Sequence, residues 1–185
     1  MSNTEKNNSR SALEILISLV VCTMLGSLMF ISDIIMEFLP NIHIVGVLVV
    51  IYTIAYRSRA LISIYVYALV NGLVSGFGIW WIGYLYIWTI LWALVMLVPR
   101  GLGDRVKSVI YVAIVTLHGF AFGLLYLPVQ TFFSTDPAYL FSWWAIGFVT
   151  ADIYHGIANC IFGILLIAPL SKVLRKLNAS LIMIE

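Results

Sequence analysis

Long apolar runs separated by short polar segments constrain this chain more than any other feature. Of its 185 residues, 63% are hydrophobic and 10% are charged, whereas soluble domains carry about a quarter charged residues. Because backbone polar groups in lipid must be paired within the chain, runs of this length predict membrane-crossing helices. We expect six spans: Leu13 to Leu39, Ile42 to Tyr56, two within Ala60 to Val98, Val106 to Tyr126, and Phe141 to Ala168.

Prolines and glycines mark the ends of these runs. Pro40 stops the first, the stretch Ser75 to Gly78 turns the chain between the third and fourth, and Pro169 kinks or ends the sixth. The first run is too long for a signal-peptide core and lacks an Ala-x-Ala site, so we expect it to remain uncleaved. The predicted fold class is all-α, an integral membrane bundle of six transmembrane helices. It occupies residues 12–176, between a loose polar segment, 1–11, and a short tail, 177–185.

All ten basic residues fall on alternate loops of this arrangement. They precede the first span, separate the second from the third and the fourth from the fifth, and follow the sixth. They are Lys6, Arg10, Arg57, Arg59, Arg100, Arg105, Lys107, Lys172, Arg175 and Lys176. Basic loops remain on the cytoplasmic side of a membrane. We therefore expect both termini to be cytoplasmic in a multi-pass protein of the bacterial plasma membrane.

Three ionisable residues gather at the outer end of the first span. Asp33 and Glu37 are four residues apart and share a helix face, and His43 follows just past Pro40. Ionisable groups inside membrane spans are costly and usually functional. Two interpretations stand: a cluster solvated at the surface, or the mouth of an outward-facing pocket.

A second polar group lies deeper, at similar depths in the fifth and sixth spans. His118 is in the fifth, while Asp152, His155 and Asn159 share one face of the sixth. These side chains either join helices by hydrogen bonds or contact a ligand; a metal site is the least favoured alternative. Asn71 in the third span is a weaker candidate of the same kind.

Aromatic residues concentrate around the third and fifth loops, on the side expected to be outside. They form either an interfacial belt or a stacking surface for a planar ligand. They are Trp80, Trp81, Tyr84, Tyr139, Trp143 and Trp144.

Small residues recur four apart on the first span, at Ser18, Cys22 and Gly26. Such a stripe lets another helix approach closely, either within the chain or from a second membrane subunit. The sequence contains no Gly-x-x-x-x-Gly-Lys-Ser/Thr phosphate loop, zinc-protease motif or nucleophile elbow. We expect no enzyme activity, no cofactor and no nucleic-acid partner.

The chain resembles the substrate-binding S components of energy-coupling factor (ECF) transporters over nearly its whole length. The residues that carry this are Phe30-Ile31-Ser32-Asp33 with Glu37 to His43, the turn Gly76-Phe77-Gly78-Ile79-Trp80-Trp81, and Asp152-x-x-His155. The resemblance implies a subunit that captures a vitamin-like small molecule from outside. It also implies a partnership, in membrane lipid, with a transmembrane coupling subunit and two ATPase subunits.

The resemblance further implies ligand contacts near the outer side, and a docking stripe on the first helix at Ser18, Cys22 and Gly26. The ligand contacts would be Trp80, Trp81, Tyr84, His118, Trp143, Trp144, Asp152, His155 and Asn159. Two other functions remain open: a membrane-embedded enzyme using His118, Asp152 and His155 for metal or acid–base chemistry, and a small independent secondary transporter. The ligand could be a flavin, pterin, thiamine-like or cobalamin-type compound.

Overall fold

A computed structural model describes the backbone of residues 3–182 and the side chains of residues 12–179, and this part of the chain is helical with no strand. The predicted all-α class is therefore confirmed. The elements are α1 (Asn3–Met36), α2 (Val45–Tyr56), the 3-10 turn η1 (Arg57–Arg59), α3 (Ala60–Ser75), α4 (Ile79–Met96), α5 (Asp104–Phe120), α6 (Phe122–Gln130), α7 (Pro137–Gly147), the π-helical turn η2 (Phe148–Asp152) and α8 (Ile153–Ile182).

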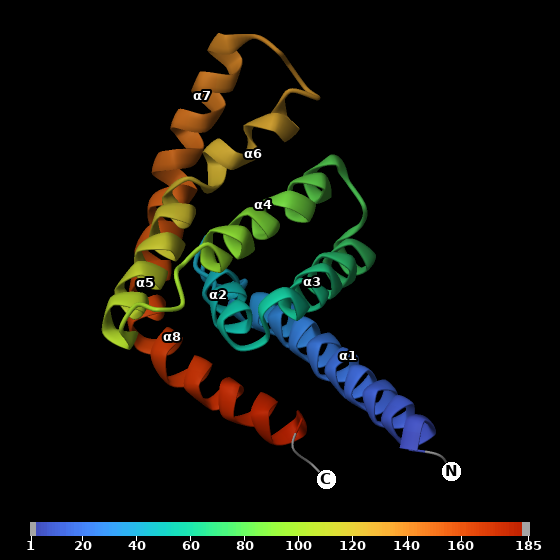
Figure 1. Cartoon of the computed structure of the whole chain (residues 1–185). Coiled ribbons are helices and arrows are strands. Elements are labelled where there is room, and N and C mark those ends of the chain that lie inside the picture. Colours follow the sequence, from blue (N-terminus) through green and yellow to red (C-terminus); the bar gives the residue numbers. More distant parts are fainter. Residues whose placement is uncertain (1–2, 183–185) are drawn as a thin grey trace.

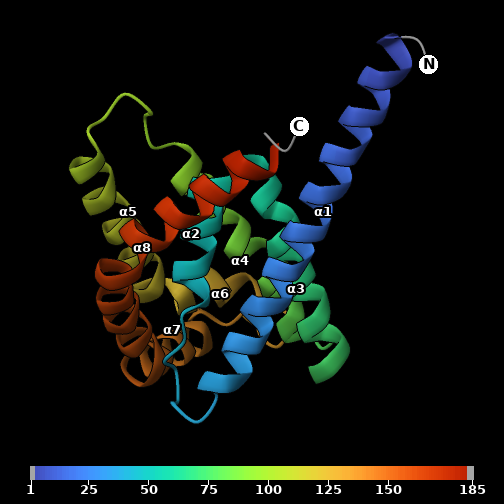
Figure 2. The same ribbon diagram turned by 90° about the horizontal axis from the view of Figure 1, so that it is seen from below.

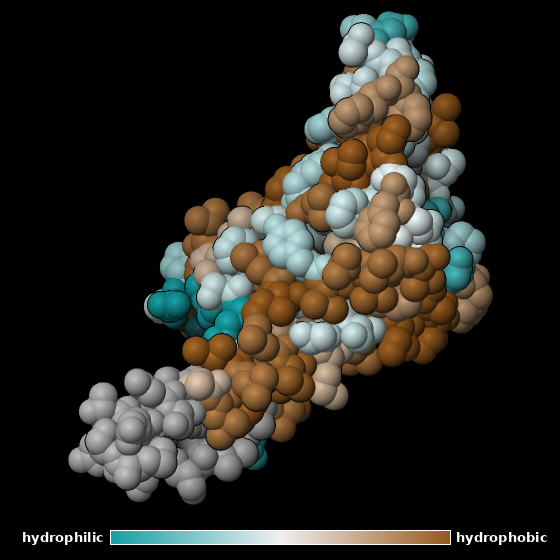
Figure 3. All heavy atoms as spheres, turned by 90° about the vertical axis from the view of Figure 1, so that its right-hand side faces the viewer, coloured by the Kyte–Doolittle hydropathy of each residue, from teal (hydrophilic) through white to brown (hydrophobic). Residues whose placement is uncertain are grey.

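The short helix α2 is the centre of the bundle. All of its residues are buried, and it packs mainly against α8, α4 and α3 (Figures 1 and 2). A helix that is apolar on every side is stable where protein or lipid covers it, and here neighbouring helices cover it on every side. The outer helices instead expose apolar side chains such as Met24, Ile35 and Ile164, and brown hydrophobic atoms cover much of the face in Figure 3. This exposed surface is typical of a protein embedded in lipid.

Four helical stretches of the described chain are long and apolar enough to cross a membrane, or five if α5 and α6 count together. One of the four, Val45–Ser75, contains both α2 and α3, joined through η1. The prediction of six spans instead treats this stretch as two spans, separated at Arg57 and Arg59. Arg57 has a positive φ of 57°, which breaks the helix there. In both ribbon views the described ends of α1 and α8 lie toward the same end of the molecule.

The last two predicted spans are not continuous α-helices, which corrects the sequence-based expectation. The helix expected over 106–126 bends by 42° between α5 and α6, and α6 continues through Pro128 to Gln130. The helix expected from Phe141 begins at Pro137, behind an Asp136 N-cap, and contains the π turn η2. Pro169 does not end α8, although the helix changes direction in its last part (Figure 1).

At both ends the helices extend into the segments expected to flank the bundle, the loose polar segment 1–11 and the short tail 177–185. The backbone of α1 is helical from Asn3, and that of α8 as far as Ile182. Once a helix is nucleated by its apolar part, each added residue gains one further backbone hydrogen bond, so helices readily continue into polar flanks.

Candidate ligand-binding cavity

A cavity of about 410 Å³ lies where α1 ends and α2 begins. Its walls come from the last turns of α1 and α3, the first turns of α4, α6 and α8, and the segment between α1 and α2. The residues that line it are Phe30, Asp33, Ile34, Met36, Glu37, Leu39, Asn41, Ile42, His43, Asn71, Ser75, Tyr84, Phe122 and His155. Its volume is within the range of small-molecule sites, roughly 300–1,000 Å³.

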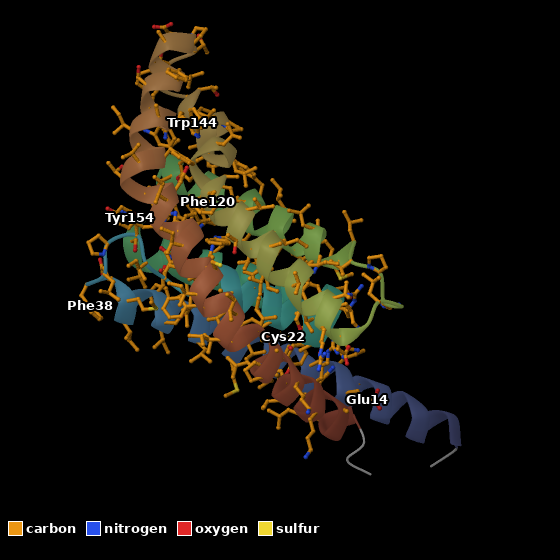
Figure 4. All side chains as sticks on the ribbon, turned by 90° about the vertical axis from the view of Figure 1, so that its left-hand side faces the viewer. Glu14, Cys22, Phe38, Phe120, Trp144 and Tyr154 are labelled. Atoms are coloured by element: carbon orange, nitrogen blue, oxygen red, sulfur yellow. The ribbon has the colours of Figure 1, made fainter. Side chains whose placement is uncertain are left out.

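The segment between α1 and α2 closes one side of this cavity. Asn41, which has a positive φ of 61°, donates a hydrogen bond from Nδ2 to the Thr150 carbonyl oxygen at 3.0 Å. This bond ties the segment to the π turn before α8. In Figure 4, Phe38 of this segment accordingly lies at the same edge of the molecule as Tyr154. Glu14, which lies in α1, is far from both. The cavity is thus enclosed by parts of the chain that are far apart in sequence.

Asp33 is fixed in the cavity wall by α3. The Tyr67 hydroxyl donates to Asp33 Oδ2 at 2.8 Å, and Asn71 Nδ2 donates to the same oxygen at 3.3 Å. Both bonds end on one oxygen, which leaves Oδ1 available to a ligand. Glu37, one turn further along α1, is exposed at the rim of the cavity. The three ionisable residues at this end of the first span, Asp33, Glu37 and His43, therefore all line the same cavity.

Two histidines form the inner part of the wall. The rings of His43 and His155 lie 4.9 Å apart between centroids, and His155 is only 9% exposed. Neither Nδ1 atom has a hydrogen-bond partner within the described chain; the nearest carboxylate oxygen to His155 Nδ1, Asp152 Oδ1, is 4.0 Å away. Burial, with a smaller effect of His118, lowers the pKa of His43 to about 4. His43 is therefore neutral near pH 7.

Trp88 is buried behind the cavity wall, where its ring contacts the wall residues His43, Tyr84 and Phe122. It was not identified as a site residue from the sequence. It is 2% exposed, and its ring centroid lies 5.7–6.3 Å from those of His43, Tyr67, Tyr84, His118 and Phe122. Edge-on and tilted aromatic contacts at these distances are favourable. The available signal was the spacing of Trp80, Tyr84 and Trp88, four residues apart, which puts three aromatic rings on one face of α4.

Asp152 belongs to a helix junction rather than to the cavity lining. Both of its carboxylate oxygens accept a hydrogen bond from the Gly123 N–H, each at 3.0 Å. Gly123 is in the first turn of α6, where the break at Ala121 leaves N–H groups without partners in the helix. A carboxylate at a helix N-terminus satisfies such a donor and complements the helix dipole. Asp152 therefore stabilises the bend between α5 and α6.

His118 and Asn159 also join helices. His118 Nε2 lies 3.1 Å from the Ile87 carbonyl oxygen of α4, and Asn159 Nδ2 donates to the Val115 carbonyl oxygen of α5 at 3.1 Å. Both side chains are buried, and neither lines the cavity. Of the inner polar group expected to contact ligand, the structure brings only His155 to the cavity.

The outer aromatic residues are divided among several places, and only Tyr84 lines the cavity. Trp80, Tyr126 and Tyr139 border a separate hollow of about 430 Å³. Trp81 donates from Nε1 to the Ala68 carbonyl oxygen at 2.7 Å. Trp143 stacks on Tyr126, and Trp144 contacts Phe141 and Phe148. Trp144 is labelled in the upper part of Figure 4.

The small-residue stripe lies along the contact between α1 and α3. The Ser63 hydroxyl donates to the Cys22 carbonyl oxygen at 2.8 Å, and a Cβ added to Gly26 would lie 2.5 Å from the Ser63 carbonyl oxygen. Cys22 is fully buried, and the Ser18 hydroxyl is buried as well. Cys22 and Gly26 thus pack within the chain, the first of the two alternatives for this stripe, while docking of a second subunit at Ser18, Cys22 and Gly26 stays a prediction.

In the part of the chain that the structure describes, no group of three His, Cys, Asp or Glu side chains is placed to hold a metal ion. No protein-family profile, curated protein or solved structure matches the chain. The cavity and its polar lining are therefore the basis for proposing a function.

Proposed function

We propose that the chain is the substrate-capturing subunit of an ECF-type transporter, which takes up a vitamin-like small molecule from outside the cell. The observation that carries this proposal is the cavity of about 410 Å³ lined by Asp33, His43, Asn71, Tyr84 and His155. An apolar pocket with a few convergent polar groups is the usual form of a small-molecule site.

The charge distribution supports an outward-facing cavity. The cavity is built at the ends of α1 and α3, at the beginnings of α4, α6 and α8, and at the segment just before α2. The described basic residues occupy the opposite ends of these helices, at 57–59, 100–107 and 172–176. If basic segments remain cytoplasmic, the cavity opens to the outside, and six spans place both termini inside.

A partner must supply the energy for release. A subunit that binds its ligand from outside can deliver it inward only if another interaction changes its conformation. The sequence has no phosphate loop of its own. We therefore propose that a membrane coupling subunit with two ATPases provides this step, and that the chain itself is neither an enzyme nor an independent transporter.

Uptake measured with and without the coupling module tests the proposal. Cells or proteoliposomes containing the chain together with a coupling subunit and its ATPases should accumulate ligand only when ATP is hydrolysed. His155→Ala should reduce uptake, whereas Tyr154→Ala, a matched change at a half-exposed neighbour outside the cavity, should leave it unchanged. Uptake that persists without any ATPase would refute the subunit hypothesis.

A further inference from the structure

Two carboxyl groups line the cavity, and no Lys or Arg side chain of the described chain lies beside them. Asp33 and Glu37 both line it, and neither forms an ion pair with a described residue. None of the described Lys and Arg side chains lines it. Since the pKa of His43 is about 4, that ring adds no positive charge near neutral pH.

We infer that the ligand is a small organic cation, with a protonated amine or a quaternary nitrogen that binds beside Asp33 and Glu37. This inference rests on the proposed function and adds the chemical class of the substrate to it. An unpaired carboxylate in a low-dielectric wall is unfavourable, and a cationic partner removes that penalty.

The hydrogen bonds of Asp33 favour such a partner. Tyr67 and Asn71 hold Oδ2, so the carboxylate is oriented before ligand arrives and Oδ1 remains free. Hydrogen bonds between an ionised donor and a carboxylate are roughly twice as strong as neutral ones. Because two neutral donors already fix the side chain, a cation gains this bond with little loss of side-chain entropy.

His155 provides a second, independent indication of a ligand. Its ring is nine-tenths buried and lines the cavity. Nδ1 is sealed from solvent on the side of Asp152, whereas Nε2 is accessible and forms no hydrogen bond within the described chain. Polar atoms of nearly buried side chains normally have a partner, so an unpartnered nitrogen at a cavity wall points to a ligand atom. Phe122 lies 5.2 Å from this ring, and Tyr84 is also on the wall. A planar heterocycle with a cationic group can stack on these rings.

Matched compounds that differ in charge test the inference. Pyridoxamine, pyridoxine and 4-pyridoxate share one ring and carry a cationic, a neutral and an anionic substituent; thiamine and its neutral tricyclic oxidation product thiochrome form a second set. Binding to the purified full chain is measured by calorimetry and by thermal stabilisation. We expect at least one cation to bind about tenfold or more tightly than its neutral counterpart, with no binding of the anion.

A pair of variants separates the site from general electrostatics. Asp33→Asn keeps the shape and should weaken cation binding about tenfold or more, whereas Asp136→Asn, at an exposed carboxylate outside the cavity, should leave it unchanged. Equal or tighter binding of a neutral or anionic compound, or unchanged cation affinity in Asp33→Asn, would overturn the inference while leaving capture of a small molecule intact.

The small molecule that co-purifies with the chain provides a test that does not depend on the panel. Mass spectrometry of the released compound should reveal a protonatable amine or quaternary nitrogen, and a compound without either overturns the inference. If no compound co-purifies, none of the panel binds, and the coupled uptake assay is also negative, the proposed function itself fails.

Discussion

Gly123→Ala should destabilise the fold by breaking the contact that holds the bend between α5 and α6. An added Cβ would lie 2.6 Å from Asp152 Oδ2, so the carboxylate must move away from the Gly123 N–H. Losing hydrogen bonds to a charged group costs about 1.5–3 kcal/mol, while replacing a helical glycine by alanine gains about 0.5–1 kcal/mol. The net loss is about 1–2 kcal/mol, or a decrease in Tm of roughly 2–8 °C for a chain of this size.

Thermal unfolding in detergent, followed through the reactivity of the buried Cys22 thiol, measures this effect. Gly147→Ala is the control, because a Cβ there meets no atom within 4 Å. In an Asp152→Ala background, Gly123→Ala should cost little, since the carboxylate that the new methyl displaces is already absent. Equal Tm values for the two glycine variants, or additive effects of Gly123→Ala and Asp152→Ala, would refute the capping role.

Three further predictions concern packing, pH and sidedness. Gly26→Leu should lower the Tm strongly, because the added side chain would separate α1 from the Ser63 carbonyl of α3. Thermal unfolding measures this effect, and Gly101→Leu, at a position where an added Cβ meets no atom within 4 Å, is the control. Since burial lowers the pKa of His43 from 6.5 to about 4, only the unfolded chain takes up this proton in that window. The contribution of His43 to stability should therefore be constant above pH 6.5 and decrease as the pH falls from 6.5 to 4, and His43→Gln should reduce the slope of Tm against pH in that window. In a chain without its native cysteines, Ser134→Cys should react with an impermeant maleimide in intact cells, and Gly101→Cys only after permeabilisation; the reverse would contradict the proposed orientation.

Hydrophobicity and glycine placement were sufficient to predict most of the helices. The turn at Gly76, with φ of 89°, lies where the sequence expects it, between the third and fourth helices. The breaks at Ala121 and in the π turn were not predicted, because their cause is not local. Gly123 meets Asp152 across 29 positions of the chain, and hydropathy along one span contains no signal of that contact.

The candidate site was predicted in part for a related reason. Spacing predicted that Asp152, His155 and Asn159 share one helix face, yet Asp152 ends the π turn η2 before α8, and only His155 lines the cavity. A helical repeat shows which residues share a face but not which backbone group each one meets. Asp33 and His43 were identified because ionisable residues are rare in apolar runs, whereas Trp88 was missed because an aromatic residue in such a run is ordinary.

The shortness of α2 has a consequence for the depth of the cavity. Twelve residues rise about 18 Å, whereas the hydrocarbon layer of a bilayer is about 30 Å thick. A helix of full length at this central position would continue through the space that the cavity now occupies, between the ends of its neighbours. The depth of the cavity is thus determined by where α2 begins, so inserting a single helical turn before Val45 would move Ile42 and His43 out of the cavity wall.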